Sequence, residues 1–96
     1  MKKATKSRIT MFESNPSIFD VRKYTAGEKE KLLRYMKSFE PYAAAGKITD
    51  CVTGERLDEE DVGYTDGEFM WTSRDIYHVN LYNASVSDEF FKIATK

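Results

Sequence analysis

The sequence predicts an α+β fold with one long helix, a small antiparallel sheet and two short C-terminal helices. Three observations support this class: a helix-capping pattern at residue 25, an Asp-Gly pair at residues 66–67 between aromatic-rich segments, and two helix-start patterns after residue 71. Helices and strands that are grouped along the chain, instead of alternating, are typical of α+β domains.

Length and composition are those of one globular domain. The chain has 96 residues, of which 41% are hydrophobic and 32% charged. A chain of this size can bury one compact core, and this composition is not that of a disordered protein. We expect a basic flexible arm at residues 1–8, where four Lys/Arg occur without apolar periodicity, and a single domain at residues 9–96. For residues 9–24 the sequence is compatible with a short strand and with a turn or helix start, and both alternatives are kept.

The chain has no pattern for export or membrane insertion. No apolar run approaches the roughly 20 residues that a membrane-spanning helix needs, and the basic N-terminus lacks the apolar stretch of a signal peptide. Cys51 is the single cysteine, so it cannot form an internal disulfide. We therefore expect a soluble, cytoplasmic protein with no membrane partner.

A helix is predicted at residues 26–39. Thr25 and Glu28 have the spacing of a capping box, in which each side chain accepts a hydrogen bond from the other residue's backbone N–H. Pro41 disfavours helical angles at Glu40, so the helix ends before that residue. One face carries apolar residues at three-to-four-residue spacing, which places this face against the core. These residues are Leu32, Leu33, Met36 and Phe39.

Extended segments and turns are predicted after this helix. The segment YAAAGKITDCVTGERL, residues 42–57, is expected to hold two short extended pieces that Gly46 separates. A tight turn is expected at residues 50–55, which include an Asp and a Gly. The acidic run at residues 58–61 is expected to be a loop. Residues 62–72 predict a hairpin, because an Asp-Gly pair suits a type I′ turn and aromatic residues favour strands.

Two helices follow the hairpin. Thr72 or Ser73 is the expected N-cap of the first, with Asp75 in its first turn, and Asn83 can adopt the left-handed conformation that ends it. Its apolar residues are too many for one narrow stripe, so this helix is expected to be buried on two sides. The second helix begins at Ser87, where Val86 and Phe91 have the spacing of a hydrophobic staple.

Charge is unevenly distributed along the chain. Residues 1–36 carry nine Lys/Arg and four Asp/Glu, for +5, while residues 37–96 carry six and twelve, for −6. Residues 50–68 hold eight acidic residues and one arginine, for −7. A surface of one sign accelerates encounter with a partner of opposite charge, so we predict an acidic patch for a basic protein partner; a solvated loop is the simpler alternative. The patch residues are Glu55, Asp58, Glu59, Glu60 and Asp61.

Catalytic and metal-binding patterns are weak. His78 is the only histidine, and a solvated, partly exposed side chain is the simplest expectation for it. Asp75 lies one helical turn before His78 and could orient its imidazole, and Cys51 could be a nucleophile if the fold brings it close. One Cys and one His are too few for a zinc site, and no EF-hand or nucleotide-binding motif is present. We assign no catalytic residue, metal or cofactor, and we rank a non-enzymatic role first.

Three segments resemble a loosely defined family of small, mostly uncharacterised bacterial proteins. The segments are ITDCVTGE, YTDGEFMWTSRDIYHVNLYN and SVSDEFFKI, and the resemblance covers roughly residues 25–93. The pattern is a D-x-x-T-G-E turn, an Asp-Gly hairpin with an aromatic-x-Trp-[Ser/Thr] strand, a Tyr-rich helix and a final acidic-Phe helix. The matching positions are Asp50, Thr53, Gly54, Glu55, Asp66, Gly67, Phe69, Trp71, Thr72, Tyr77, Tyr82, Asn83 and Phe90. Cys51 departs from the pattern, which has a proline at that position.

Two classes of function are therefore predicted. Some proteins of this family are encoded beside bacterial toxins, so the resemblance implies an immunity- or antitoxin-type inhibitor, whose acidic surface would cover a basic active site. The alternative is a small ligand-binding or catalytic domain with an aromatic pocket formed by Trp71, Tyr77, His78 and Tyr82. A homodimer held by exposed aromatic residues is a third hypothesis. Nucleic-acid binding would depend on the short basic arm alone, so we rank it below these.

Overall fold

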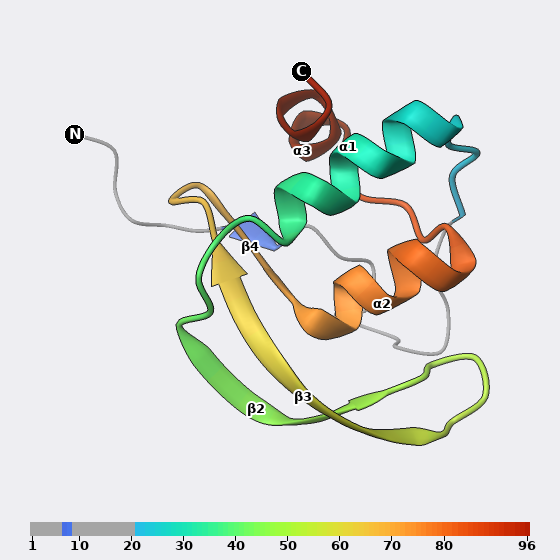
Figure 1. The fold of residues 1–96 in the computed structure, drawn as a ribbon, viewed down its shortest axis with the longest axis vertical. Helices are drawn as coiled ribbons and strands as arrows, with labels where there is room; N and C mark the ends of the chain where they lie inside the picture. Colours follow the sequence, from blue (N-terminus) through green and yellow to red (C-terminus); the bar gives the residue numbers. More distant parts are fainter. Residues whose placement is uncertain (1–6, 9–20) are drawn as a thin grey trace.

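The fold is α+β, as the sequence predicts. A computed structural model describes residues 7–8 and 21–96. The elements are β1 (Ser7–Arg8), α1 (Ala26–Met36), β2 (Ala43–Thr49), β3 (Arg56–Thr65), β4 (Phe69–Thr72), α2 (Ser73–Tyr82) and α3 (Asp88–Ala94). In Figure 1 the long β2–β3 hairpin curves along one side of α2, with α1 and α3 beyond that helix. Helix α2 contacts β2, β3 and β4, so it is the helix that packs most directly on the sheet.

In the part of the chain that the structure describes, the sheet has four strands in the order β1-β4-β3-β2. The β2–β3 and β3–β4 pairs are antiparallel, whereas β1 runs parallel to β4, with Ser7 opposite Phe69. Ser7 and Arg8 therefore form a short strand, although the sequence pattern assigned them to a flexible arm. The other predictions for residues 1–6 and 9–20 lie outside the described residues.

Helix α1 begins as predicted and ends three residues early. The Glu28 N–H donates to Thr25 Oγ1 at 3.1 Å, and the Thr25 N–H donates to Glu28 Oε1 at 3.0 Å, which completes the capping box. The helix ends at Met36, and the next residue, Lys37, is its C-cap. Phe39 consequently leaves the helix, and its ring contacts Trp71 edge-on, with 5.7 Å between the ring centroids. Tertiary packing of Phe39, and not helical periodicity, decides its position.

Strand β2 is continuous through Gly46, where two separate pieces were predicted. Gly46 has a φ of 89°, a conformation that other residues rarely adopt, and the pairing with β3 shifts between Ala44 and Lys47. One extra residue on β2 produces a β-bulge, which bends a strand without ending it.

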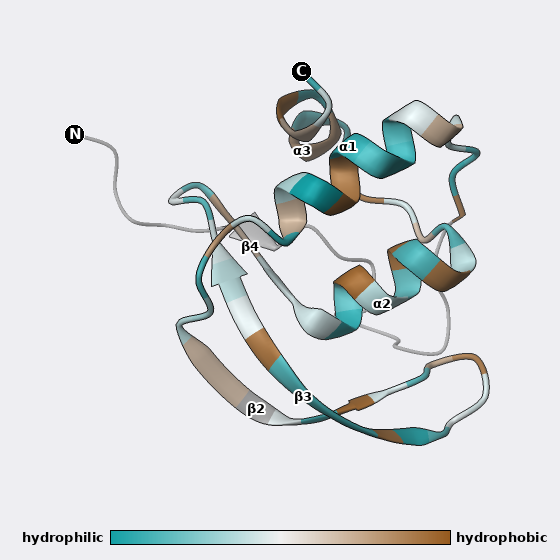
Figure 2. Cartoon of the chain, in the orientation of Figure 1, coloured by the Kyte–Doolittle hydropathy of each residue, from teal (hydrophilic) through white to brown (hydrophobic). Residues whose placement is uncertain are grey.

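The prediction of a loop at residues 58–61 is wrong, because these residues belong to β3. This strand lies between β2 and β4, so its backbone pairs on both sides along part of its length. Its side chains at 58–60 are exposed, and Figure 2 shows this part of β3 as hydrophilic. The segment lacks the apolar alternation that identifies a half-buried strand in a sequence; pairing with β2 supplies the stability instead.

The hairpin at residues 62–72 is confirmed, with a different turn. Tyr64 lies opposite Trp71 and stacks on it at a centroid distance of 6.4 Å. Within the described residues, Gly67 has a positive φ, of 99°, but Asp66 does not, so the turn is not type I′. The side chain of Asp66 closes the turn by accepting the N–H groups of Glu68 and Phe69, at 2.9 and 2.8 Å.

The C-terminal helices begin and end close to the predicted residues. Thr72 is the N-cap of α2, and its N–H donates to Asp75 Oδ2 at 2.9 Å. Asn83 ends α2 in the left-handed conformation, with a φ of 59°. Ser87 caps α3 by accepting the Phe90 N–H at 3.3 Å, and the predicted staple residues Val86 and Phe91 are both buried.

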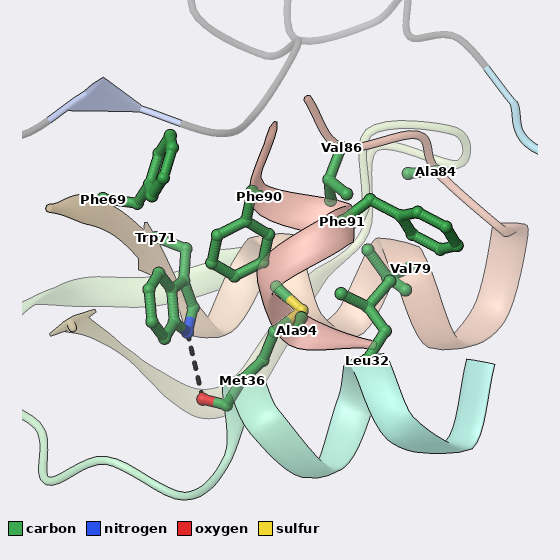
Figure 3. Close-up of a cluster of buried hydrophobic side chains, with 10 residues drawn as sticks. All are labelled: Leu32, Met36, Phe69, Trp71, Val79, Ala84, Val86, Phe90, Phe91 and Ala94. Atoms are coloured by element: carbon green, nitrogen blue, oxygen red, sulfur yellow. Dashed lines mark hydrogen bonds between the residues drawn. The ribbon is translucent and has the colours of Figure 1, made fainter. Parts of the chain in front are cut away.

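The core lies where the three helices meet β4 (Figure 3). Trp71 is its largest side chain, with 1% of its surface exposed, and its indole N–H donates to the Met36 carbonyl at 3.0 Å. The rings of Tyr35, Phe39 and Phe90 also contact Trp71. The single tryptophan therefore connects α1, β4 and α3, and its indole N–H satisfies the carbonyl of the last residue of α1.

Replacing Trp71 by alanine is expected to lower the free energy of unfolding by about 3–5 kcal/mol, because the change leaves a large cavity and an unpaired Met36 carbonyl. Urea unfolding followed by circular dichroism measures this loss. Leu81→Ala is the matched control, since Leu81 is 55% exposed, and it should change stability by less than about 1 kcal/mol. A Trp71→Ala variant as stable as the control would contradict a structural role for the tryptophan.

Candidate functional site

The predicted acidic patch divides into two parts in the structure. Asp58, Glu59 and Glu60 are exposed on β3; we call these three residues the acidic strand. Glu55 is also exposed, in the turn before β3. Asp61 is half-buried, and its Oδ1 accepts the Arg74 N–H at 2.9 Å in the first turn of α2. A carboxylate at this position stabilises a helix N-terminus, so Asp61 has a structural role.

Strands β2 and β3 carry two cations near the acidic strand, Lys47 and Arg56. Lys47 is opposite Glu60 on β2, but its Nζ donates to the backbone carbonyl of Asp58 at 2.9 Å. Among the residues that the structure describes, the ion pairs join Arg22 to Asp88 and Arg34 to Glu30, and none involves the acidic strand. The three carboxylates therefore keep their charge available to a partner.

A groove borders the acidic strand, between β3 and α2. Its volume is about 540 Å³. It is lined by Lys37, Ile48, Glu59, Glu60, Val62, Tyr64, Ser73, Ile76, Tyr77 and Asn80. Neighbouring residues on a regular strand point to opposite faces, yet both Glu59 and Glu60 line this groove. The register of the pairing explains this. Lys47 pairs with Glu60 and Thr49 pairs with Arg56, so an advance of two residues along β2 corresponds to four residues along β3. The alternation of side chains is therefore interrupted in this part of β3.

The four residues of the predicted aromatic pocket do not surround one cavity. Trp71 lies in the core, in ring contact with residues of α1, β3 and α3. The His78 ring contacts Tyr77 and Tyr82 instead. Of the four, Tyr77 lines the groove. The aromatic residues thus belong to two clusters that both hold the fold together.

His78 is fully buried, which corrects the prediction of a solvated side chain. Its Nδ1 lies 2.7 Å from the Arg74 carbonyl, which can only accept, so Nδ1 carries the proton. Its Nε2 accepts the Cys51 N–H at 2.9 Å. Burial lowers the pKa of His78, which favours this neutral form. The Arg74 carbonyl, and not Asp75 as predicted, accepts the Nδ1–H of His78, while Asp75 Oδ2 accepts the Thr72 N–H.

Cys51 and His78 are in contact, but the contact is made by the backbone N–H of Cys51 and not by its thiol. The thiol Sγ is 3.9 Å from the Thr49 carbonyl oxygen. Burial raises the pKa of the Cys51 thiol, which disfavours the reactive thiolate. Because Nε2 of His78 already accepts a hydrogen bond, it is not positioned to take a proton from the thiol. This arrangement is a structural link between the β2–β3 turn and α2.

Asp50 is the residue at the centre of that link, and the sequence pattern identified it only as a turn residue. Its Oδ1 accepts the N–H groups of Val52 and Thr53, at 2.8 and 3.0 Å. Its Oδ2 accepts the hydroxyls of Tyr77 and Tyr82, at 2.7 and 2.6 Å. The residue is 3% exposed. The four hydrogen bonds make this buried carboxylate an anchor between the turn and α2.

The hydrogen bonds also set the charge of Asp50. Burial by itself raises the pKa of this carboxyl, but the bonds from Tyr82, Tyr77 and the two backbone N–H groups outweigh burial and hold the pKa well below its ordinary value. The hydrogen bond to Asp50 in turn raises the pKa of Tyr77 to about 12. Asp50 is therefore ionised at neutral pH although it is buried.

Metal and membrane sites can be assessed for the described residues. In residues 7–8 and 21–96, no group of three or more His, Cys, Asp or Glu side chains is arranged to hold a metal ion. Across the same part of the chain, every helix is too short or too polar to cross a bilayer.

The comparisons with known proteins give no match to a family model, to a curated protein or to a solved structure. The resemblance to a loosely defined family of small, mostly uncharacterised bacterial proteins therefore stays a prediction.

Asp50→Asn is expected to make stability less dependent on pH in acid. The folded pKa of Asp50 is below its unfolded value of about 3.9, so the unfolded chain binds the proton first and stability falls as pH decreases below about 4. Above pH 4 the variant should be less stable by at least about 1.5–3 kcal/mol, the contribution of one hydrogen bond to a charged group. The difference should shrink below pH 4.

Urea unfolding of both proteins between pH 2.5 and 7 measures this effect. Asp58→Asn controls for the loss of one negative charge, because Asp58 is exposed. A difference between wild type and Asp50→Asn that stays constant down to pH 2.5 would show that the anchor does not depend on the ionised carboxylate.

Proposed function

We propose that the protein is a non-enzymatic binding protein that uses the acidic strand to bind a basic protein partner. The observation that carries the proposal is the position of Asp58, Glu59 and Glu60, which are exposed side by side on β3, where Glu60 pairs with Lys47 of β2. A strand held in a sheet presents its charges in a fixed arrangement, so binding costs less conformational entropy than binding by a loop would.

The states of the reactive side chains support a non-enzymatic role. Both ring nitrogens of His78 are hydrogen-bonded to backbone groups, and the oxygens of Asp50 accept four hydrogen bonds. General acid–base catalysis needs a group within reach of substrate whose proton can move. These two residues are instead buried and committed to the fold.

An immunity-type inhibitor is the form of this function that the family resemblance favours. A nuclease must bind phosphate groups with Lys and Arg, so an acidic surface is complementary to its active site. The acidic strand has this character, because its three carboxylates are exposed and form no ion pair within the described residues. The expected partner is therefore a basic protein, with a nuclease as the leading candidate.

Reversing the acidic strand to lysine (Asp58→Lys, Glu59→Lys, Glu60→Lys) is expected to abolish capture of a basic partner from a lysate of the native host. The control reverses three other exposed acidic residues, Glu30, Glu40 and Glu89, so the change in net charge is the same. Asp61 stays unchanged in both, because its carboxylate accepts the Arg74 N–H in the first turn of α2. Circular dichroism should show both variants folded, since exposed charges contribute about 1 kcal/mol or less each.

The captured protein is then purified and its association rate measured at several salt concentrations. We expect association to slow at least about tenfold for the reversed strand and to weaken steeply with salt for wild type, because charge complementarity acts mainly on the on-rate. A partner that binds the reversed strand as fast and as tightly as it binds the control would refute the proposal.

A further inference from the structure

The groove between β3 and α2 combines an apolar floor with a charged rim. Its apolar lining comes from Ile48, Val62, Tyr64 and Ile76. Glu59 and Glu60 of β3 line the groove, as does Lys37, the residue that follows α1. Its volume of about 540 Å³ is in the range of roughly 300–1,000 Å³ that ligand sites occupy. The groove is large enough for one long side chain of a partner.

Two of the polar groups in the groove are already hydrogen-bonded within the protein. Ser73 Oγ lies 3.1 Å from the Val62 N and accepts its hydrogen. The Tyr77 hydroxyl donates to Asp50. The carboxylates of Glu59 and Glu60 are therefore the groups that give the groove its selectivity for charge, and they favour a cation.

We propose that this groove is the anchor site for an arginine side chain of the basic partner. The aliphatic stem would lie on the apolar floor, and the guanidinium would be held by Glu59 and Glu60. Arginine fits better than lysine because its planar cation binds carboxylates with two parallel hydrogen bonds and stacks on aromatic rings, and two tyrosines line the groove. The inference rests on the proposed function, since it names the residue by which the basic partner is recognised.

Lys37 provides an independent test of whether the groove binds a cation. Its ammonium is the one cation among the residues that line the groove in the described structure, and it repels an incoming guanidinium. Replacing Lys37 by glutamine should therefore strengthen arginine binding about two- to threefold. A role of Lys37 in binding an anion would predict the opposite change.

The test uses acetyl-arginine amide as the probe, with backbone amide signals followed by NMR. Addition of the probe should shift the signals of Val62, Ile76 and Tyr77, and acetyl-lysine amide should bind at least threefold more weakly. Glu59→Gln with Glu60→Gln should weaken binding about tenfold, whereas Glu30→Gln with Glu89→Gln should leave it unchanged, because both of these residues are exposed and neither lines the groove. Absence of shifts at the groove, or equal binding of the lysine probe, overturns the inference.

Filling the groove separates anchoring from general charge attraction. Asn80→Trp places a bulky ring in the groove and keeps all the acidic residues, and Leu81→Trp is the matched control on the exposed neighbour that does not line it. Asn80→Trp should weaken probe binding at least tenfold and Leu81→Trp should not. Equal binding by both variants overturns the inference.

The experiments also distinguish the inference from the proposed function. If the groove fails this test while the partner still requires the acidic strand, the inference is wrong and the proposed function is kept. If the probe binds as expected but the partner ignores the acidic strand, the proposed function fails instead.

Discussion

Each turn of the β2–β3–β4 meander is held by an aspartate that bonds both the turn and a helix. Asp50 accepts two backbone N–H groups of its turn with one oxygen and two α2 hydroxyls with the other. Asp66 does the same in the next turn, where Oδ1 accepts the N–H groups of Glu68 and Phe69 and Oδ2 accepts the Tyr35 hydroxyl of α1 at 2.7 Å. A carboxylate has about four acceptor positions, so one residue can hold both partners. Burial raises the pKa of Asp66, but these hydrogen bonds outweigh burial and lower it, as they do for Asp50.

This arrangement explains how a strand with three consecutive exposed acidic residues stays in place. Strand β3 has the Asp50 anchor before it and the Asp66 anchor after it, and Ser73 of α2 bonds the Val62 backbone between them. The anchors also account for the chemistry of the site. The groups that could react, His78 and the two α2 tyrosines, are used to connect the turn and the helix. The exposed carboxylates of β3 are left as the surface available to a partner, and the groove beside them is walled by the anchored helix.

Local patterns in the sequence predicted the parts of the fold that local interactions determine. The capping box at Thr25, the left-handed Asn83 and the hairpin at Asp66 involve neighbouring residues, so their spacing identified them. The strand conformation of residues 58–61 was not predicted, because this part of β3 is held by the pairing with β2 and has no apolar pattern of its own. The burial of His78 and the anchor at Asp50 were missed for the same kind of reason, since their partners lie 27 to 32 residues away. The composition identified the acidic residues of the predicted patch, but the half-buried position of Asp61 depends on where α2 begins.

Amide hydrogen exchange in a variant that carries Tyr77→Phe and Tyr82→Phe tests the central claim most directly. The change removes both hydroxyls from Asp50 and keeps the rings, while the Asp66 anchor is untouched. We expect faster exchange at the β2–β3 turn and in the adjoining half of β3, because opening this region would no longer break two hydrogen bonds to a charged group. Exchange at the β3–β4 turn should stay as in wild type. Unchanged exchange at the β2–β3 turn, or an equal acceleration at both turns, would contradict the claim that each aspartate anchors its own end of β3.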